Sequence, residues 1–393
     1  MTGSTTLILG GGWGGLATAY HLRRDLAPEH RIVVVERSDT FSMCVSYLWL
    51  MNGKRQSLTQ VRREMATLKR PGIEWVQAEA LSLDPTDRTV DTNEGRLTGD
   101  YVVLALGAEL APDAVAGFDA AAHNLYDGAG AVGLRAALGS FTGGRIVVLV
   151  AGTPFRCPAA PYEAAMLVEA ELRERGIRDR TEMSFYTPEP RPMLVAGRAI
   201  SDALENMLSE KGIGYHPQHQ VKSIEPDTRT LHFADKTVPC DLLIGIPPHR
   251  PPALLAAAGL ADDTGYVPVH PQTLEILSNL ENLEVAYPGV YAIGDVTSIR
   301  LLNQLLLPKA GVFAEAQAQV VADAIASEIR GEPRSANFDG QGSCYVETGD
   351  GLAAYGSGDF YAYPEPRVKL EDPTTAARQA KEEYEQLLDA WFE

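Results

Sequence analysis

The stretch TLILGGGWGGLATAYHLRR, residues 6–24, contains an apolar run, a glycine-rich turn and a helical pattern in that order. Gly10, Gly12 and Gly15 fit the spacing G-x-G-x-x-G, which permits a tight turn, close approach of the backbone to a pyrophosphate and close packing of helix on strand. The N-terminus of the following helix favours an anion because its free N–H groups and its dipole point there. The stretch therefore predicts the first strand, turn and helix of an α/β dinucleotide-binding fold.

A second apolar run extends this interpretation. RIVVVER, residues 31–37, ends in Glu36, which lies about 20 residues beyond the third glycine. An acidic side chain at this position can bind the hydroxyl groups of an adenosine ribose. We include Glu36 and its neighbour Arg37 in the predicted cofactor-binding set. Both NAD and FAD contain the adenosine part that such a site binds, so this stretch alone leaves both ligands open.

A pair of segments further along the chain indicates which of the two, NAD or FAD, binds at this site. GVYAIGDVTSI, residues 289–299, predicts a strand, and LPKAGVFAEAQAQVVADAIASEI, residues 307–329, predicts a long helix. The pair resembles the second FAD fingerprint of flavoproteins with two dinucleotide-binding domains, where the Asp binds the ribityl chain and the helix points at the flavin pyrimidine ring. The resemblance implies FAD at the first site. It adds to the cofactor-binding set the residues Gly107, Gly294, Asp295, Lys309, Ala310 and Gly311.

Lys309 is open to two interpretations. A cation beside the flavin would stabilise the anionic reduced form. The alternative is a solvated residue at the start of a helix.

The middle of the chain lacks a second glycine turn. The strand RIVVLVAG, residues 145–152, and the helix YEAAMLVEAELRERG, residues 162–176, are joined by GTPFRCPAAP, residues 152–161. Gly152 alone remains of the glycine pattern, and the prolines stiffen the turn and remove backbone donors that a pyrophosphate needs. The sequence therefore disfavours NAD(P)H binding. It also lacks the C-x4-C pair of the disulfide reductases after the second strand, where Cys44 stands by itself.

These patterns predict an α/β fold with two Rossmann-like dinucleotide-binding domains and a C-terminal region that ends in an amphipathic helix. The expected domains are a discontinuous FAD-binding domain of residues 1–110 and 251–335, a second Rossmann-like domain of residues 111–250 that carries Cys157 and is degenerate for NAD(P), and a C-terminal region of residues 336–393 that carries Cys344.

The C-terminal helix is expected over residues 374–393. One of its faces would present Ala377, Ala380, Tyr384, Leu387, Leu388 and Trp391. Interfacial helices usually carry Lys and Arg on the polar face, whereas this stretch is acidic, which favours packing against the protein itself or a partner over a membrane.

Four segments together carry a closer resemblance. They are FRCPAAPYEAA (155–165), PPHRPP (247–252), the GD…PKAG…AEAQ block and GSCYVETGDGLAAYG (342–356). In order and spacing they are similar to the sulfide:quinone oxidoreductases and to the flavoprotein subunit of flavocytochrome c sulfide dehydrogenase, over almost the whole chain. In that family two cysteines face each other over the flavin, joined directly or through extra sulfur atoms. The resemblance implies that Cys157 and Cys344 are this redox-active pair.

The chain differs from many members of that family in its other cysteines. Many members have a third cysteine about thirty residues before the first of the pair, and HNLYDGAGA, residues 123–131, has none. Cys44 lies near the position through which flavocytochrome c sulfide dehydrogenase attaches its FAD, so it is either a thioether to the flavin or a free thiol. Cys240 is expected in the core.

The resemblance also implies a mechanism. Hydrosulfide would attack the bond between Cys157 and Cys344, leaving a persulfide on one cysteine and a thiolate on the other. Cys344 would be the thiolate that reacts with the flavin, and the product would be zero-valent sulfur or polysulfide. Glu163 matches a family carboxylate beside the disulfide and is expected to act as a general acid and base with a raised pKa. Its alternative role is to complement the dipole of its helix.

A quinone is the expected electron acceptor. The loop IRLLNQLLLPKAG, residues 299–311, concentrates five leucines before the flavin-facing helix, as a quinone ring and tail would need. Its alternative is a loop folded into the domain core. The segment contains Leu301, Leu302, Leu305, Leu306 and Leu307.

Composition limits the partners. The net charge of −18 disfavours nucleic acid, and no Cys/His spacing indicates a metal site. No secretory signal stands at the start, so we expect a protein in the cytoplasm or peripheral at the cytoplasmic membrane. Peripheral membrane contact and a homodimer stay open. The alternative functions are an NAD(P)H-dependent quinone or ferredoxin reductase and a cytochrome c-linked sulfide dehydrogenase flavoprotein.

Overall fold

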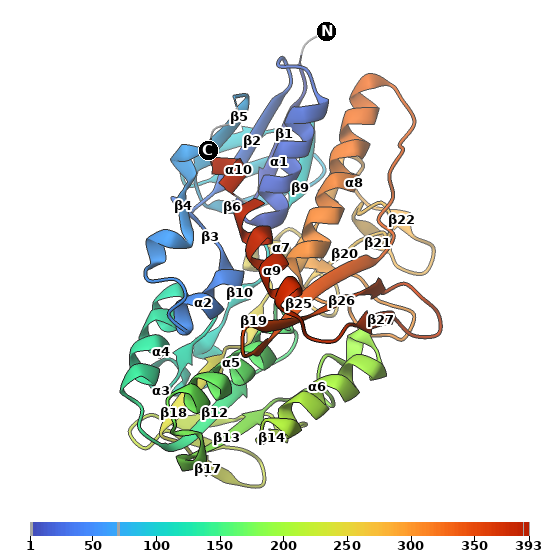
Figure 1. The fold of residues 1–393 in the computed structure, drawn as a ribbon. Helices are drawn as coiled ribbons and strands as arrows, with labels where there is room; N and C mark the ends of the chain where they lie inside the picture. The colour runs from blue at the N-terminus through green and yellow to red at the C-terminus, as the bar shows by residue number, and fades with distance from the viewer. Residues whose placement is uncertain (1–2, 69–70, 388, 393) are drawn as a thin grey trace.

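The computed structural model describes residues 3–68, 71–387 and 389–392 (Figure 1). Its first sheet is parallel, with strand order β23-β9-β1-β2-β5. The strands are β1 (Thr5–Leu9), β2 (Arg31–Glu36), β5 (Ile73–Gln77), β9 (Tyr101–Leu104) and β23 (Val290–Ala292). The central strands are continuous apolar runs because a parallel sheet is covered on both faces. Since β23 joins β9, the chain returns to its first sheet after building the second.

Two helices lie side by side against the first sheet, α1 (Trp13–Asp25) and α8 (Gly311–Arg330) (Figure 1). The glycine turn brings α1 close to β1, since a Cβ added at Gly15 would lie 1.9 Å from the carbonyl oxygen of Gly10. That spacing fulfils the packing role which the sequence assigns to the third glycine.

The second sheet is also parallel, with order β11-β18-β12-β13-β14. Its strands are β11 (His123–Asn124), β12 (Gly144–Val150), β13 (Thr181–Tyr186), β14 (Ile213–His216) and β18 (Leu242–Ile246), and its helices are α4 (Gly128–Ser140), α5 (Ala160–Glu174) and α6 (Arg198–Glu210). The two parallel sheets confirm the predicted α/β fold with two Rossmann-like units. The domain boundaries stay a prediction.

The C-terminal region adds an antiparallel sheet and two helices. They are β25 (Gln341–Gly349), β26 (Leu352–Asp359), β27 (Arg367–Leu370), α9 (Thr375–Leu387) and α10 (Asp389–Phe392). Strand β25 packs across α5, and α9 packs on β26 (Figure 1). The helix expected over 374–393 is helical over 375–387 and 389–392, and Leu388 of its expected apolar face lies outside the described residues.

The remaining elements are short. They are β3 (Thr40–Ser42), β4 (Arg62–Glu64), β6 (Ala80–Asp84), β7 (Thr89–Thr92), β8 (Gly95–Thr98), β10 (Glu109–Leu110), β15 (Ser223–Glu225), β16 (Thr230–His232), β17 (Thr237–Pro239), β19 (His249–Arg250), β20 (Val267–Pro268), β21 (Leu277–Asn279), β22 (Glu284–Val285), β24 (Thr297–Ser298), α2 (Tyr47–Met51), α3 (Phe118–Ala121) and α7 (Ala253–Ala257).

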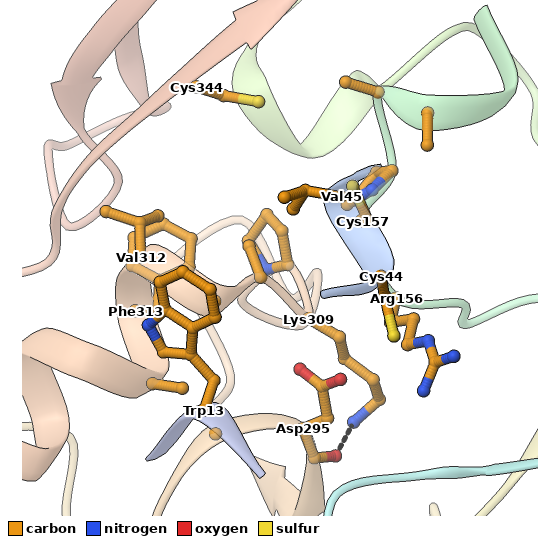
Figure 2. A pocket seen from close by; sticks show the side chains of 18 of the residues that line it. Trp13, Cys44, Val45, Arg156, Cys157, Asp295, Lys309, Val312, Phe313 and Cys344 are labelled. Carbon is orange, nitrogen blue, oxygen red and sulfur yellow. Dashed lines mark hydrogen bonds between the residues drawn. The ribbon is translucent and has the colours of Figure 1, made fainter. Parts of the chain in front are cut away.

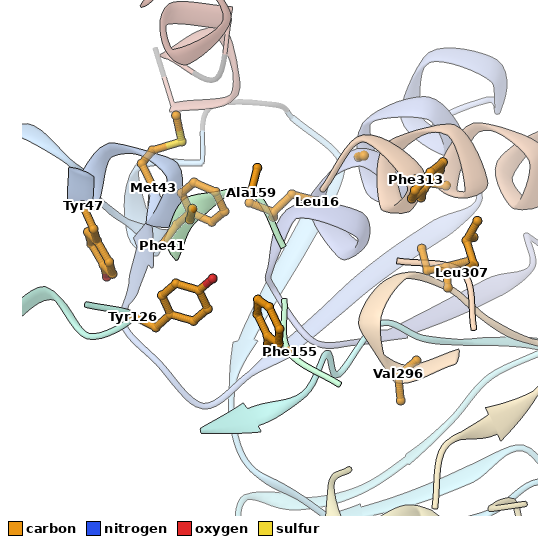
Figure 3. Packing of buried hydrophobic residues seen from close by; sticks show 14 of the residues in the cluster. Leu16, Phe41, Met43, Tyr47, Tyr126, Phe155, Ala159, Val296, Leu307 and Phe313 are labelled. Atoms are coloured by element: carbon orange, nitrogen blue, oxygen red, sulfur yellow. The ribbon is translucent and has the colours of Figure 1, made fainter. Parts of the chain in front are cut away.

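One hydrophobic cluster connects the two sheets and the C-terminal region. Phe155 and Ala159 of the loop before α5 pack in it with Leu16 of α1 (Figure 3). A smaller cluster in the second domain contains Cys240, which is 4% exposed, so the prediction of a core cysteine is confirmed. Across the described ranges, no helix has both the length and the apolar character that crossing a bilayer requires.

Candidate active site

A cavity of about 540 Å³ lies between the glycine turn after β1, the loop before α5 and strand β25 (Figure 2). Most of the residues predicted from the sequence line it: Gly10, Gly12, Glu36, Cys44, Gly107, Cys157, Glu163, Gly294, Asp295, Lys309, Ala310, Gly311 and Cys344. The structure thus brings together segments that lie far apart in the chain, from Gly10 to Cys344.

Two predicted residues lie elsewhere. Gly15 is inside the turn, packed on Gly10. Arg37 is not among the described residues that line the cavity, and its exposed guanidinium pairs with Glu79 and Glu109 at 3.4 Å each, so its role in cofactor binding stays a prediction.

Glu36 closes the glycine turn. One of its carboxylate oxygens accepts the N–H of Gly11 at 2.7 Å and the other accepts the N–H of Ser38 at 2.8 Å. Gly10 has a φ of +107°, which L side chains rarely adopt. A Cβ added at Gly12 would meet no atom of the described residues within 4 Å, so the backbone there is open to the cavity.

Asp295 and Lys309 form the floor of the cavity (Figure 2). The ammonium of Lys309 donates to the backbone oxygens of Asp295 at 2.6 Å and Thr297 at 3.3 Å, and it lies 3.4 Å from the ring centroid of Tyr266. Burial lowers the pKa of Lys309 to about 8. Burial raises the pKa of Asp295, although the charges of Lys309 and Arg156 oppose it. Lys309 is 5% exposed, so it is not the solvated residue of the alternative interpretation.

The loop before α5 holds Cys157 in an unusual backbone conformation. Its φ is +49°, a left-handed value that costs free energy for a residue other than glycine. Three hydrogen bonds fix it: its N–H donates to Lys309 at 2.7 Å, and its carbonyl accepts from Tyr126 Oη and from the N–H of Ala160, each at 3.0 Å. The loop is therefore attached to the segment that precedes α8.

Cys157 and Cys344 enter the cavity from different sides, Cys157 from this loop and Cys344 from β25 (Figure 2). All four cysteines of the chain are free thiols, so the bond that the resemblance implies between these two is not formed here. Burial raises the pKa of Cys157 to about 12, and the charge of Glu163 adds to the rise. Cys344 is exposed and lines the cavity, and partial desolvation there raises the pKa of its thiol as well, with a further rise from the charge of Cys157.

Glu163 lies in the first turn of α5 and is 2% exposed. Its Oε1 accepts the N–H of Glu347 at 2.8 Å and the ammonium of Lys381 at 2.5 Å. Burial raises its pKa, which the charge of Lys381 partly offsets. The carboxylate thus lies on the cavity wall and is paired with a cation of the C-terminal helix, and its role as a general acid and base stays a prediction.

This ion pair belongs to a buried cluster that the sequence analysis missed. The ammonium of Lys381 also lies 3.1 Å from Glu347, whose carboxylate accepts from Trp49 Nε1 at 2.6 Å and pairs with Arg378 at 2.7 Å. Two acidic and two basic side chains neutralise one another, which permits their burial. The one available signal was Arg378 and Lys381 three residues apart on one helix face, within an otherwise acidic stretch.

The C-terminal helices cover another wall of the cavity. Tyr384 of α9 stacks on Trp13 with ring centroids 5.4 Å apart, and Trp391 of α10 contacts the rings of Trp13 and Tyr20. The described residues of this stretch pack against the protein itself, but its buried residues include the basic Arg378 and Lys381, whereas Ala377 and Ala380 of the expected apolar face are only half-buried.

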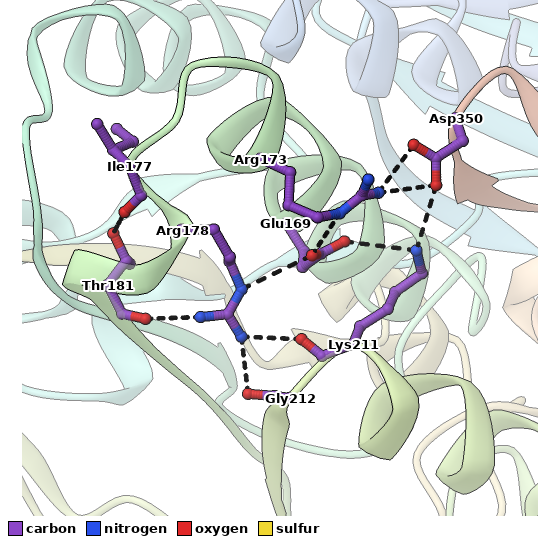
Figure 4. A network of polar contacts seen from close by, with 8 residues as sticks. All are labelled: Glu169, Arg173, Ile177, Arg178, Thr181, Lys211, Gly212 and Asp350. Carbon is purple, nitrogen blue, oxygen red and sulfur yellow. Dashed lines mark hydrogen bonds and ion pairs between the residues drawn. The ribbon is translucent and has the colours of Figure 1, made fainter.

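A second polar network anchors the hairpin that carries Cys344 (Figure 4). Asp350, in the turn between β25 and β26, pairs with Arg173 of α5 at 2.7 Å, and Arg173 also pairs with the buried Glu169 at 2.8 Å. Lys211 pairs with both carboxylates. The hairpin is thereby fixed to the same helix whose N-terminus follows Cys157.

The leucine loop divides between core and surface. Leu301 and Leu307 are buried, whereas Leu302 is 63% and Leu305 37% exposed. None of the five leucines is among the described residues that line the cavity.

A family model matches most of the chain. Its description is pyridine nucleotide-disulphide oxidoreductase, and it covers residues 4–188 and 184–319. Among curated proteins, a sulfide-quinone reductase of Aquifex aeolicus is 28% identical over 83% of this chain and 77% of its own length. A mitochondrial sulfide:quinone oxidoreductase of mouse is 24% identical over 91% of this chain and 78% of its own length.

A solved structure agrees with these matches. The X-ray structure of the sulfide:quinone oxidoreductase from Aquifex aeolicus superposes with a TM-score of 0.86 at 25% identity, over 99% of this chain and 91% of that one. The similarity therefore includes the C-terminal region beyond residue 319, where the family model ends.

Proposed function

The chain belongs to the pyridine nucleotide-disulphide oxidoreductase family, and from that premise we propose that it uses FAD to oxidise sulfide and pass the electrons to a quinone. The observation that carries the proposal is that Cys157 and Cys344 line the same cavity as the glycine turn after β1. Both curated relatives and the superposed structure are named for sulfide and quinone.

The cavity fits FAD. At Gly12 the backbone is open where a Cβ would meet no described atom within 4 Å, and the N-terminus of α1 follows directly, as a pyrophosphate requires. Glu36 would bind the adenosine ribose, and the buried carboxyl of Asp295 would bind the ribityl chain. FAD bound there would supply the two-electron acceptor that reoxidises the cysteine pair and the donor that reduces the quinone.

The cysteines would perform the sulfur chemistry in two exchanges. In the oxidised pair, HS⁻ forms a bond to one sulfur and breaks the bond between Cys157 and Cys344, giving a persulfide and a thiolate. A second HS⁻ then takes the outer sulfur of the persulfide and releases the second thiolate. The pair gains two electrons, and two sulfides lose them to become a disulfide anion, the first polysulfide.

Glu163 would accept the proton that HS⁻ releases in this reaction. The incoming HS⁻ carries one proton, which must leave as the sulfur forms its new bond, and the carboxylate of Glu163 is the buried acceptor on the cavity wall. Its raised pKa matches the task, because a carboxylate that holds a proton too weakly cannot take it from sulfur near neutral pH.

The second turn supports sulfide over NAD(P)H as the electron donor. A Cβ added at Gly152 would already lie 3.0 Å from Pro248, and Phe155 is buried in the core where a dinucleotide would need open backbone. For the acceptor, Leu302 and Leu305 present apolar surface on the loop that leads to Lys309, which suits a quinone with an apolar tail.

The test is turnover by the purified enzyme with sulfide and a short-tailed quinone under anaerobic conditions. We expect one quinol for each pair of electrons that sulfide loses, and polysulfide or zero-valent sulfur as the product. Quinol formation driven by NADH but not by sulfide would refute the proposal.

A further inference from the structure

We propose that Lys381, from the C-terminal helix α9, is the positive charge that stabilises anionic sulfur at Cys157 and Cys344. The inference rests on the sulfur chemistry proposed above and adds a charge-positioning residue to it. Lys381 lines the cavity with both cysteines and is 8% exposed. Its ammonium is held from two directions, at 2.5 Å by Glu163 of α5 and at 3.1 Å by Glu347 of β25.

The site needs such a charge. Every step of the sulfur exchange leaves a thiolate or persulfide anion at thiols whose pKa desolvation already raises, so an uncompensated charge there is costly. Arg378 cannot serve as easily, because its guanidinium is paired with Glu347 at 2.7 Å and is not among the described residues that line the cavity. Arg156 does line the cavity, and it bonds to the carbonyl of Tyr126 at 3.1 Å.

The electrostatics agree with this geometry. The charge of Lys381 lowers the pKa of both cysteines, and the charge of Glu163 raises both. Burial alone would lower the pKa of Lys381, but the charges of Glu163, Glu347 and then Cys344 raise it overall, so the ammonium stays charged near neutral pH. The two partners of one ion pair therefore act on the sulfur atoms in opposite directions.

Because Lys381 and Glu163 shift the pKa of the cysteines in opposite directions, an electrostatic role of Lys381 can be distinguished from a structural one. If the pair only holds α9 to α5, removing either partner perturbs the site in the same way. If Lys381 stabilises anionic sulfur, Lys381→Met makes the thiolates rarer and Glu163→Gln makes them more abundant.

The experiment measures iodoacetamide alkylation of Cys157 and Cys344, peptide by peptide, in the reduced, FAD-loaded protein at about pH 9. Below the thiol pKa the rate follows the thiolate fraction, so one unit of pKa changes it about tenfold. We expect Lys381→Met to slow both cysteines about tenfold, Glu163→Gln to accelerate them, and Lys381→Arg to restore most of the rate.

The matched control is Lys54→Met. Lys54 pairs with Glu382 of the same helix at the surface and does not line the cavity. Its alkylation rates should equal those of the unchanged protein. Equal rates in Lys381→Met, or the same direction of change in Lys381→Met and Glu163→Gln, overturn the inference. If Lys381→Met does not fold, Glu163→Gln alone decides: an alkylation rate no faster than that of the unchanged protein overturns the inference.

This readout does not depend on turnover. Opposite alkylation shifts in a protein that sulfide cannot reduce would keep the role of Lys381 and reject the proposed function. Normal sulfide turnover, with alkylation rates unchanged in Lys381→Met and Glu163→Gln, would keep the proposed function and reject the role of Lys381.

Discussion

The two strand-to-helix turns of this molecule occupy equivalent places in two parallel sheets, yet they are built for different ligands. After β1, the backbone at Gly12 is open, and Glu36 ties the turn at 2.7 Å. After β12, a Cβ added at Gly152 would lie 3.0 Å from Pro248, and the N–H of Cys157 donates to the carbonyl of Lys309 at 2.7 Å.

The difference shows that the fold alone does not fix the ligand. The first turn keeps what a pyrophosphate needs, namely space, free N–H groups and a helix N-terminus. In the second turn, the N–H of Cys157 donates to the carbonyl of Lys309, and the thiol of Cys157 lines the cavity. The turn between β12 and α5, where a nicotinamide cofactor would otherwise bind, thus carries the proposed sulfur chemistry.

The strongest way to break the comparison is to remove either thiol. Cys157→Ser and Cys344→Ser should each lower sulfide-dependent quinone reduction at least about 1000-fold, because a hydroxyl cannot form the bond that sulfide opens. FAD content should not change. The control is Cys240→Ala, in the core of the second domain, which should keep activity within about threefold. Substantial turnover in either serine variant would disprove the assigned chemistry.

The next test concerns Glu163, the proposed general acid and base at the start of α5. Glu163→Gln should lower turnover about 100-fold at saturating sulfide. Because burial raises the pKa of Glu163, activity of the unchanged enzyme should fall as the pH drops through a value above the usual carboxyl range. That acidic limb should be missing in the variant. A pH–rate profile measures both, and an identical limb in the two proteins would assign it to another group.

A pair of glycine variants sharpens the comparison directly. In Gly15→Ala the new Cβ would lie 1.9 Å from the carbonyl of Gly10, whereas in Gly152→Ala it would lie 3.0 Å from the side chain of Pro248. We expect Gly15→Ala to retain about tenfold less FAD after purification, because a backbone atom must move. Gly152→Ala should keep its flavin. Absorbance of FAD per chain decides, and equal loading would contradict the tight-turn interpretation.

The smallest effect is expected at Cys44. Its thiol lines the cavity and points to the carbonyl of Ser42 at 3.7 Å. We expect Cys44→Ser to change turnover less than about threefold, and the FAD of the unchanged protein to leave on denaturation. Yellow fluorescence that stays with the denatured chain would show a thioether at Cys44 instead.

Local patterns predicted the strands and the first glycine turn, whereas the family resemblance supplied most of the other residues of the cavity. The G-x-G-x-x-G turn, the Gly294–Asp295 pair and the cysteine after β12 each depend on a few neighbouring residues, so the sequence displays them. Arg37 does not line the cavity, and the motif identifies the acidic residue without indicating where the next side chain lies.

The cluster around Lys381 could not be read in this way. Glu163 and Lys381 are 218 residues apart, and only the packing of β25 across α5 and of α9 on β26 brings them together. In the sequence, a lysine among acidic residues on an amphipathic helix is typical of a solvated face. Its burial depends on two carboxylates contributed by other elements.

The most direct measurement is the flavin spectrum of the purified protein under anaerobic conditions, with sulfide or NADH added separately and a soluble quinone added afterwards. The account predicts that sulfide bleaches the flavin, that quinone restores it, and that NADH acts at least about 100-fold more slowly, because the turn after β12 lacks a pyrophosphate cradle. No response to sulfide with Cys157 and Cys344 intact, or rapid bleaching by NADH, would contradict it.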